Sequence, residues 1–143
     1  LAFAVKNLKP DYLIDIATLT GSATLGLGKQ YAAMYSRDLK FVNQLKQAGE
    51  QSGDRVWHMP LVDDYVPALD SDIADLNHTA DKYNFNGGSI TAALFLEQFV
   101  DGATWAHLDI AGVGRSETDA GENPKGGTGW GVRLLLQWIG SLK

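Results

Sequence analysis

Residues 12–21 read YLIDIATLTG, so a short apolar run changes abruptly into small hydroxyl and glycine residues. This pattern predicts a buried strand that ends in a loop where a ligand can approach the backbone. Residues 105–114, which read WAHLDIAGVG, change character in the same way. Because the loops that follow neighbouring parallel strands lie at one edge of a sheet, the two segments predict an α/β protein with a binding site at that carboxyl edge.

Helix and strand patterns alternate along the rest of the chain, which predicts an α/β fold with parallel strand pairs and no internal domain boundary. Expected helices cover residues 1–8, 38–51, 89–100 and 128–142, expected strands cover 12–17, 30–36 and a segment from Trp105, and residues 56–60 are extended. Residues 63–88 and 115–128 are polar and predicted to be irregular, and residues 21–28 form a flexible turn or a short helix.

Two of the helices carry a candidate N-cap and a candidate apolar face. Asp38 and Thr128 can cap the second and the last helix, because their side-chain oxygens can accept hydrogen bonds from free backbone N–H groups. Helical spacing predicts that one apolar stripe of each helix faces the core. The stripes are Leu39, Val42, Leu45 and Ala48 in the second helix, and Val132, Leu135, Leu136 and Ile139 in the last.

The composition favours an ordinary cytoplasmic globular protein. The chain has 143 residues, 45% hydrophobic and 20% charged, a net charge of −5 and no cysteine. The acidic balance makes nucleic acid an unlikely partner, and no apolar run is long enough for a membrane span. The first helix begins at Leu1 without an N-cap residue or an initiating methionine, so we expect the chain to be a piece of a longer protein.

The glycine-rich segments do not match a nucleotide-binding motif. Gly28 and Lys29 could end a P-loop, but that motif requires glycine at position 23 and Ser or Thr at position 30. The chain has Ala23 and Gln30 there. A glycine-rich loop beside a binding site is the preferred interpretation.

The residues alone also supply no convincing catalytic group. The three histidines lie far apart, and no serine stands in a nucleophile elbow; Ser22 is the nearest case. His107 and Asp109 lie two residues apart on a strand, so their side chains point the same way and could form a ligand pair. The favoured interpretation is that Asp15, His107 and Asp109 are structural, buried and hydrogen-bonded behind the loops.

Seven segments in order resemble the leucyl (cytosol) aminopeptidases, dinuclear metallo-exopeptidases. They are DIATLTG (15–21), GLG (26–28), WHMPL (57–61), SDIADLN (71–77), GGSITAALFL (87–96), WAHLDIAG (105–112) and GGTGWGV (126–132). The match covers almost the whole chain and resembles the carboxyl-terminal half of the family's catalytic domain. It implies a three-layer fold with a mixed, mostly parallel sheet and helices on both faces.

The resemblance implies a metal-dependent aminopeptidase that acts on peptides with a free amino terminus. Two divalent ions, Mn or Zn, polarise the scissile carbonyl and generate the nucleophile. The family's metal ligands and catalytic arginine belong to an N-T-D-A-E-G-R-L motif and to residues upstream of it, all before the position of Leu1. No catalytic or metal-binding residue, and no metal bound by this chain alone, is therefore expected. Family members are typically hexamers.

The substrate pocket is the part of the site that the resemblance places in this chain. Thr18, Leu19, Thr20 and Gly21 match the loop that meets the first residue of the substrate, and Ala111 and Gly114 match the opposite wall. The family often has a larger residue, such as methionine, at the position of Gly114, so a strict preference for leucine is in doubt. Phe3 replaces an aspartate that is usual in the first helix.

Two other functions stay open at this point. A short paralogue could bind peptides or assemble with a full-length partner without catalysis. DNA binding, a side role of some bacterial family members, is disfavoured by the acidic balance. A sheet without the remaining strands of the domain also exposes an unpaired edge, which predicts aggregation or dependence on a partner.

Overall fold

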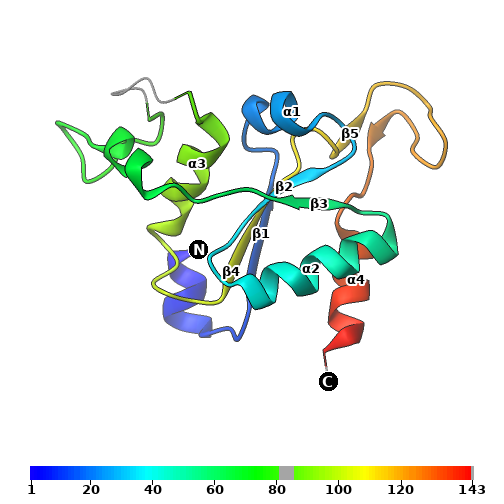
Figure 1. Ribbon diagram of the computed structural model, residues 1–143, viewed down its shortest axis with the longest axis horizontal. Helices are drawn as coiled ribbons and strands as arrows, with labels where there is room; N and C mark the ends of the chain where they lie inside the picture. The colour runs from blue at the N-terminus through cyan, green and yellow to red at the C-terminus, as the bar shows by residue number, and fades with distance from the viewer. Residues whose placement is uncertain (81–85, 143) are drawn as a thin grey trace.

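The computed structural model describes residues 1–80 and 86–142, and its centre is a four-stranded mixed sheet (Figure 1). The strand order is β1-β4-β2-β3, with bounds Leu13–Ala17, Trp105–Asp109, Ala32–Tyr35 and Val56–His58. The pairs β1/β4 and β2/β3 are parallel, whereas β2 and β4 are antiparallel. The predicted mixed, mostly parallel sheet is confirmed.

Helices cover both faces of the sheet and complete three layers (Figure 1). One face packs against α1 (Gly21–Leu27) and α3 (Gly88–Glu97), and the other packs against α2 (Leu39–Ser52) and α4 (Val132–Ser141). The pleat explains this division, because successive strand residues point to opposite faces. Thus Met34 and Leu108 join the larger core under α2 and α4, and Ala33 and Tyr35 join the smaller core under α1 and α3.

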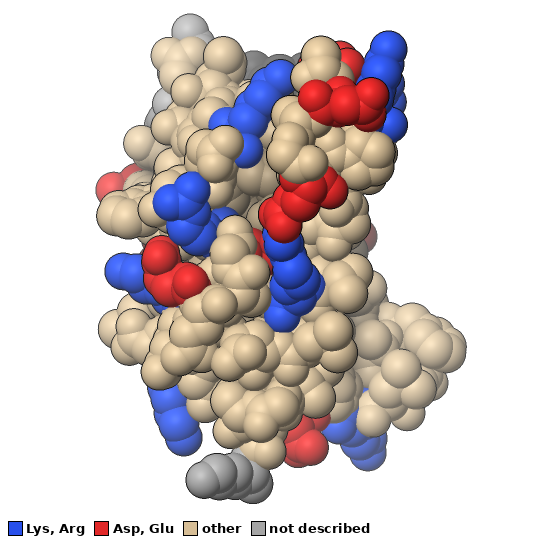
Figure 2. All heavy atoms as spheres, turned by 90° about the vertical axis from the view of Figure 1, so that its right-hand side faces the viewer, with Lys and Arg blue, Asp and Glu red and all other residues tan. Residues whose placement is uncertain are grey.

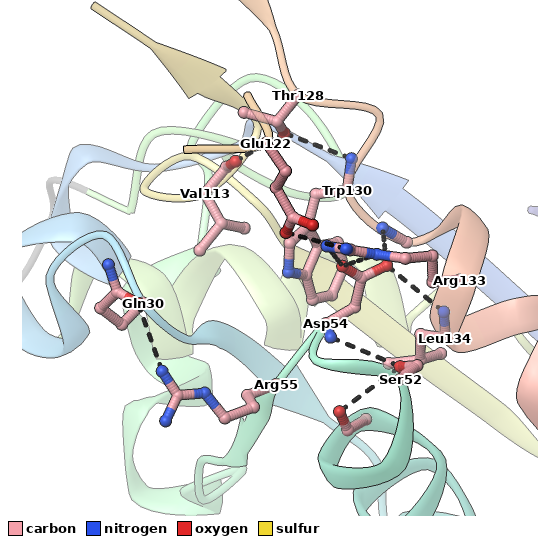
Figure 3. Close-up of polar contacts among 12 residues, drawn as sticks. Gln30, Ser52, Asp54, Arg55, Val113, Glu122, Thr128, Trp130, Arg133 and Leu134 are labelled. Atoms are coloured by element: carbon pink, nitrogen blue, oxygen red, sulfur yellow. Dashed lines mark hydrogen bonds and ion pairs between the residues drawn. The ribbon is translucent and has the colours of Figure 1, made fainter. Parts of the chain in front are cut away.

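The N-cap predicted for the last helix is wrong. The helix begins at Val132, and the Thr128 hydroxyl donates to the carbonyl of Val113 at 2.8 Å. The cap comes from Asp54, whose Oδ2 accepts from the backbone N–H groups of Gly131 (2.9 Å) and Leu134 (3.3 Å) (Figure 3). A distant carboxylate therefore replaces the local cap that the sequence suggests.

The same carboxylate is also ion-paired. Its Oδ1 accepts from Nη2 of Arg133 at 2.8 Å and from Nε at 3.2 Å, and the guanidinium reaches Glu122 with Nη1 (Figure 3). Gly131 has a φ of 98°, in the left-handed region that favours glycine, and this turn aims its N–H at Asp54. The start of α4 is thus fixed by a side chain 77 residues away.

The apolar stripe predicted for α2 is confirmed at Val42, Leu45 and Ala48 but not at Leu39, and the stripe predicted for α4 is mostly wrong. The buried residues of α4 are Leu134 and Trp138, and those of α2 are Phe41, Val42, Leu45, Ala48 and Gly49. Leu39 is 65% exposed, because it stands at the first helical position before the buried stripe begins. In α4 only Leu135 of the predicted stripe packs against the core, and Val132, Leu136 and Ile139 are exposed.

The helix α4 lies at the right in Figure 1, on the side that is turned toward the viewer in Figure 2. Basic and acidic side chains alternate across the upper half of that face, and the lower half is mostly uncharged (Figure 2). Lone exposed apolar residues are normal, but three on one helix form a patch of the kind that interfaces use.

Four smaller elements complete the described chain. Residues Ala4–Leu8 form a π-helical turn without a buried residue, where an amphipathic α-helix is expected. Residues Asp63–Leu69 form a 3₁₀ helix inside the segment predicted to be irregular, of which residues 81–85 lie outside the described part. Arg115–Ser116 and Gly126–Gly127 pair as the short strands β5 and β6. Within residues 1–80 and 86–142, no helix combines the length and apolar character needed to cross a bilayer.

Candidate substrate pocket

The two loops predicted to form the pocket leave the same edge of the sheet. The strands β1 and β4 are parallel and in register, with Ala17 opposite Asp109. Residues 18–21 follow the first strand and residues 110–114 follow the second, so the loops lie side by side. Leu19 is exposed and Ala111 and Gly114 are half-buried, so both loops present accessible surface.

The first loop is shaped by a helix cap. Thr20 has extended backbone angles and its Oγ1 accepts from the N–H of Ala23 at 3.1 Å, which makes it the N-cap of α1. Threonine is a preferred residue at this position, because its hydroxyl satisfies a free helical N–H. The short α1 therefore begins at Gly21, and residues 18–20 pass over the edge of the sheet.

A buried carboxylate ties the two loops together. Asp109 is 1% exposed, and its Oδ1 accepts from the N–H of Leu19 and from the N–H of Ala111, each at 3.1 Å. Its Oδ2 accepts from the N–H of Thr20 at 3.0 Å and from the Thr20 hydroxyl at 2.7 Å. One side chain thus bonds to both predicted walls.

Glycines set how closely the second loop approaches its surroundings. A Cβ atom at Gly112 would lie 2.1 Å from the carbonyl oxygen of Gly28, at the end of α1. A Cβ atom at Gly114 would lie 3.0 Å from both Cδ1 and the carbonyl oxygen of Ile110. The first contact is with backbone and excludes any side chain, whereas the second is tight and can be relieved in part by a shift of Ile110.

A second polar cluster lies deeper on the same face of the sheet. Asp15 accepts from His107 Nδ1 and from Trp105 Nε1, both at 2.6 Å. The Tyr35 ring stacks on His107 with centroids 5.9 Å apart. Within the described residues, the Tyr35 hydroxyl and His107 Nε2 are buried without a hydrogen-bond partner. Burial, together with the negative charge of Asp109, raises the pKa of Tyr35 to about 12, although nearby Ser89 opposes the shift.

The histidines are occupied by neighbours and form no metal centre. His107 pairs with Asp15, the His58 Nε2 bonds the carbonyl of Ser36 at 3.0 Å, and His78 packs its ring against Phe95. The oxygens of Asp109 face loop donors, so His107 and Asp109 do not act as a ligand pair. Across residues 1–80 and 86–142, no group of three or more His, Asp or Glu side chains could hold a metal ion. The described residues thus do not fit the metal pair that the resemblance implies.

The buried and hydrogen-bonded state expected of His107 and Asp109 is confirmed, and Asp15 is the partly exposed member of its cluster. The hydrogen-bond donors to Asp109 could not be predicted from the sequence. The only signal that the sequence offers there is an acidic residue just before a small-residue loop. The ion pairs of Arg37 with Asp63 and Glu97 were also missed, because these residues are distant in sequence.

Comparison with known proteins identifies one family along nearly the full chain. Residues 1–136 match the family model described as "Cytosol aminopeptidase family, catalytic domain". The probable cytosol aminopeptidase of Synechococcus sp. (strain JA-3-3Ab) is 46% identical over 139 residues, which is 97% of this chain and 26% of that protein. The probable cytosol aminopeptidase of Prochlorococcus marinus (strain MIT 9215) is 49% identical over 134 residues, 93% of this chain and 27% of that protein.

A solved structure gives the same result in three dimensions. A mutant of tomato leucine aminopeptidase superposes with a TM-score of 0.86 at 37% sequence identity. The superposition covers 97% of this chain and 26% of that one. The chain therefore spans about a quarter of the length of the relatives it matches.

Proposed function

The chain belongs to the cytosol aminopeptidase family, and we propose that it is the substrate-pocket part of a metal-dependent aminopeptidase that removes amino-terminal residues from peptides. The observation that carries this proposal is the pair of small-residue loops at the ends of β1 and β4, joined through Asp109. Binding sites of α/β proteins lie at such carboxyl edges of parallel strands.

The roles of the loops follow from what a first residue and its free amine require. An apolar side chain needs small wall residues that leave room, and the peptide backbone needs exposed N–H and C=O groups. Thr18, Leu19, Thr20 and Gly21 would meet the substrate on one side, and Ala111 and Gly114 on the other. The two divalent ions, Mn or Zn, would be held by other parts of the whole protein and would supply the activation of water there.

The assembled state and location are proposals of the same kind. The relatives are named cytosol aminopeptidases, which supports a cytoplasmic protein. The exposed apolar row Val132, Leu136 and Ile139 supports an assembly that covers α4, with a hexamer as the family expectation. Size-exclusion chromatography with light scattering on the full-length product would give the subunit number, and a monomer would contradict the hexamer.

The decisive assay measures hydrolysis of leucine p-nitroanilide by the full-length product of the reading frame in the presence of Mn²⁺ or Zn²⁺. We expect turnover that EDTA removes and added metal restores, and no turnover by residues 1–143 alone. A full-length product that binds leucine peptides but never cleaves them would instead support the non-catalytic paralogue.

Gly114 offers a direct test of the pocket in the same assay. Gly114→Met fills space between the walls, so the ratio of kcat/KM for phenylalanine to alanine p-nitroanilide should fall about tenfold. Gly140→Ala is the matched control, because a Cβ atom at that helical position meets nothing within 4 Å. An unchanged ratio in Gly114→Met would remove Gly114 from the pocket.

A further inference from the structure

Asp109 accepts hydrogen bonds from both loops, and its two carboxylate oxygens bind different groups. Oδ1 holds one N–H from each loop, Leu19 on one side and Ala111 on the other. Oδ2 holds only the first loop, through the N–H and the hydroxyl of Thr20. The distance between the loops is therefore set at a single oxygen atom, and the orientation of the first loop is set at the other.

A carboxylate is required for this arrangement. All four groups that face Asp109 are donors, and an ionised carboxylate is the side chain that offers acceptors alone. In Asp109→Asn, one carboxylate oxygen is replaced by an NH₂ group, which would face the N–H or O–H donors that this oxygen now accepts from. Either the link between the loops or the link to Thr20 would then be lost, although the volume of the side chain would hardly change.

The hydrogen bonds continue from Asp109 into α1. The Thr20 hydroxyl donates its proton to Asp109, so its lone pair is free to accept from the N–H of Ala23. In the described part of the chain, no Lys or Arg pairs with Asp109, so its charge is balanced by loop donors and the start of α1 alone. Moving this carboxylate would therefore shift the loops and the helix together.

We propose that Asp109 is a positioning residue that sets the separation of the two pocket walls and thereby the choice of the substrate's first side chain. The proposal rests on the function proposed above. Asp109 is buried beneath the loops and acts through Leu19, Thr20 and Ala111 without touching the substrate. Displaced walls would weaken the fit of one side chain more than that of another, because each fills the space between them differently.

The test compares full-length wild type, Asp109→Asn and Asp54→Asn with alanine, leucine and phenylalanine p-nitroanilides. For Asp109→Asn we expect the leucine KM to rise about tenfold, kcat to change less than about twofold, and the ratio of kcat/KM between leucine and phenylalanine to change at least about fivefold. Asp54→Asn is the matched control, because it alters another buried carboxylate, whose oxygens accept hydrogen bonds from Gly131, Arg133 and Leu134 at the start of α4 instead of from the N–H groups of the two loops. It should leave the ratio unchanged.

Thr20 supplies a second pair of variants in case Asp109→Asn fails to fold. Thr20→Val removes the hydroxyl at constant shape and should change the substrate ratio in the same direction, and Thr20→Ser, which keeps the hydroxyl bond to Asp109, should change it less than Thr20→Val does. If wild type is active and Asp109→Asn and Thr20→Val lower kcat/KM equally for all three substrates, or leave it unchanged, the positioning role is overturned and the proposed function stands. If wild type cleaves none of the substrates, the proposed function fails and the positioning role fails with it.

Discussion

Asp54 and Asp109 are both buried carboxylates at the centre of a hydrogen-bond cluster, yet their surroundings differ. Asp54 combines two backbone N–H groups at the start of α4 with the guanidinium of Arg133. Asp109 combines three backbone N–H groups and a hydroxyl, without a basic partner among the described residues. The first cluster joins the turn between α2 and β3 to the start of α4, and the second joins two loops that present accessible residues.

The difference indicates how one residue type serves two purposes. The hydrogen bonds of Arg133 to Glu122 and to Asp54 raise the pKa of its guanidinium, so the Asp54 charge lies beside a permanent cation. Donors that belong to the two loops hold Asp109, so the stability of this cluster and the shape of the loops depend on each other. We expect substitutions at Asp54 to change mainly stability and those at Asp109 to change mainly the loops.

The largest expected effect is on stability at Asp54. Asp54→Ala leaves the N–H groups of Gly131 and Leu134 without an acceptor at a buried helix start, which should lower the free energy of unfolding by about 3 kcal/mol. Asp109→Ala should cost about 2 kcal/mol, because the exposed loop residues can turn to water. Urea unfolding of each variant gives the comparison.

Glu122→Ala is the control for Asp54, since it removes the exposed second partner of Arg133 and should cost less than about 0.5 kcal/mol. If Asp54→Ala and Glu122→Ala lowered the free energy of unfolding equally, the ion pairs of Arg133, and not the cap of α4, would account for the stability of this cluster.

The next effect concerns alkaline pH. The pKa of Tyr35 is raised to about 12 from an ordinary value of 10.0 by burial, and the charge of Asp109 adds to the shift. Below pH 10 the tyrosine is neutral in the folded and unfolded states, and between pH 10 and 12 it ionises only when the chain unfolds. Stability should therefore fall by about 2 kcal/mol across this window.

Denaturant unfolding at pH 9 and pH 11 measures the first half of this loss, about 1 kcal/mol, and Tyr35→Phe should remove the part due to this tyrosine. Asp109→Asn should reduce the loss, whereas Asp54→Asn should not, because the charge of Asp109, and not that of Asp54, adds to the effect of burial on the Tyr35 pKa. If the stability of Tyr35→Phe fell as much as that of wild type between these pH values, the loss would belong to other titrating groups.

The smallest effect is at the link between Asp109 and α1. Thr20→Val removes the cap of α1 and one bond to Asp109, and should cost about 1 kcal/mol, with most of it recovered in Thr20→Ser. Thermal unfolding is sensitive enough for this difference. If Thr20→Val did not change the free energy of unfolding, α1 would be stable without its cap.

The sequence predicted local patterns well and distant contacts poorly. The apolar runs before Thr18 and Ile110 correctly indicated adjacent parallel strands, and Asp38 caps α2 as expected through its bond to the N–H of Phe41. Local chemistry is sufficient for such features, since the capping carboxylate and the N–H group that donates to it are three residues apart. The seven family segments likewise placed the chain correctly, because each keeps its order along the sequence.

The failures concern groups whose partners are distant in sequence. Thr128 looked like the cap of α4 because no local pattern could reveal Asp54. The stripe of α4 was misplaced because Val132, Leu136 and Ile139 satisfy the same helical spacing as a buried face, and only the packing of Leu134 and Trp138 against the sheet decides between them. Asp109 also accepts hydrogen bonds from Leu19 and Thr20, which precede it by 90 and 89 positions. No local sequence pattern could predict these bonds, for the same reason.

The contact of Gly112 with the carbonyl of Gly28 also determines which mutations the pocket can accept. Because any side chain at position 112 would overlap main-chain atoms, this part of the wall is closed to variation, both for natural drift and for a designed library. Position 114 is open by comparison, since its tightest side-chain neighbour is a flexible isoleucine. In the proposed pocket, a change of substrate range would thus be reached through Gly114 while Gly112 stays fixed, so two glycines separated only by Val113 would evolve at different rates.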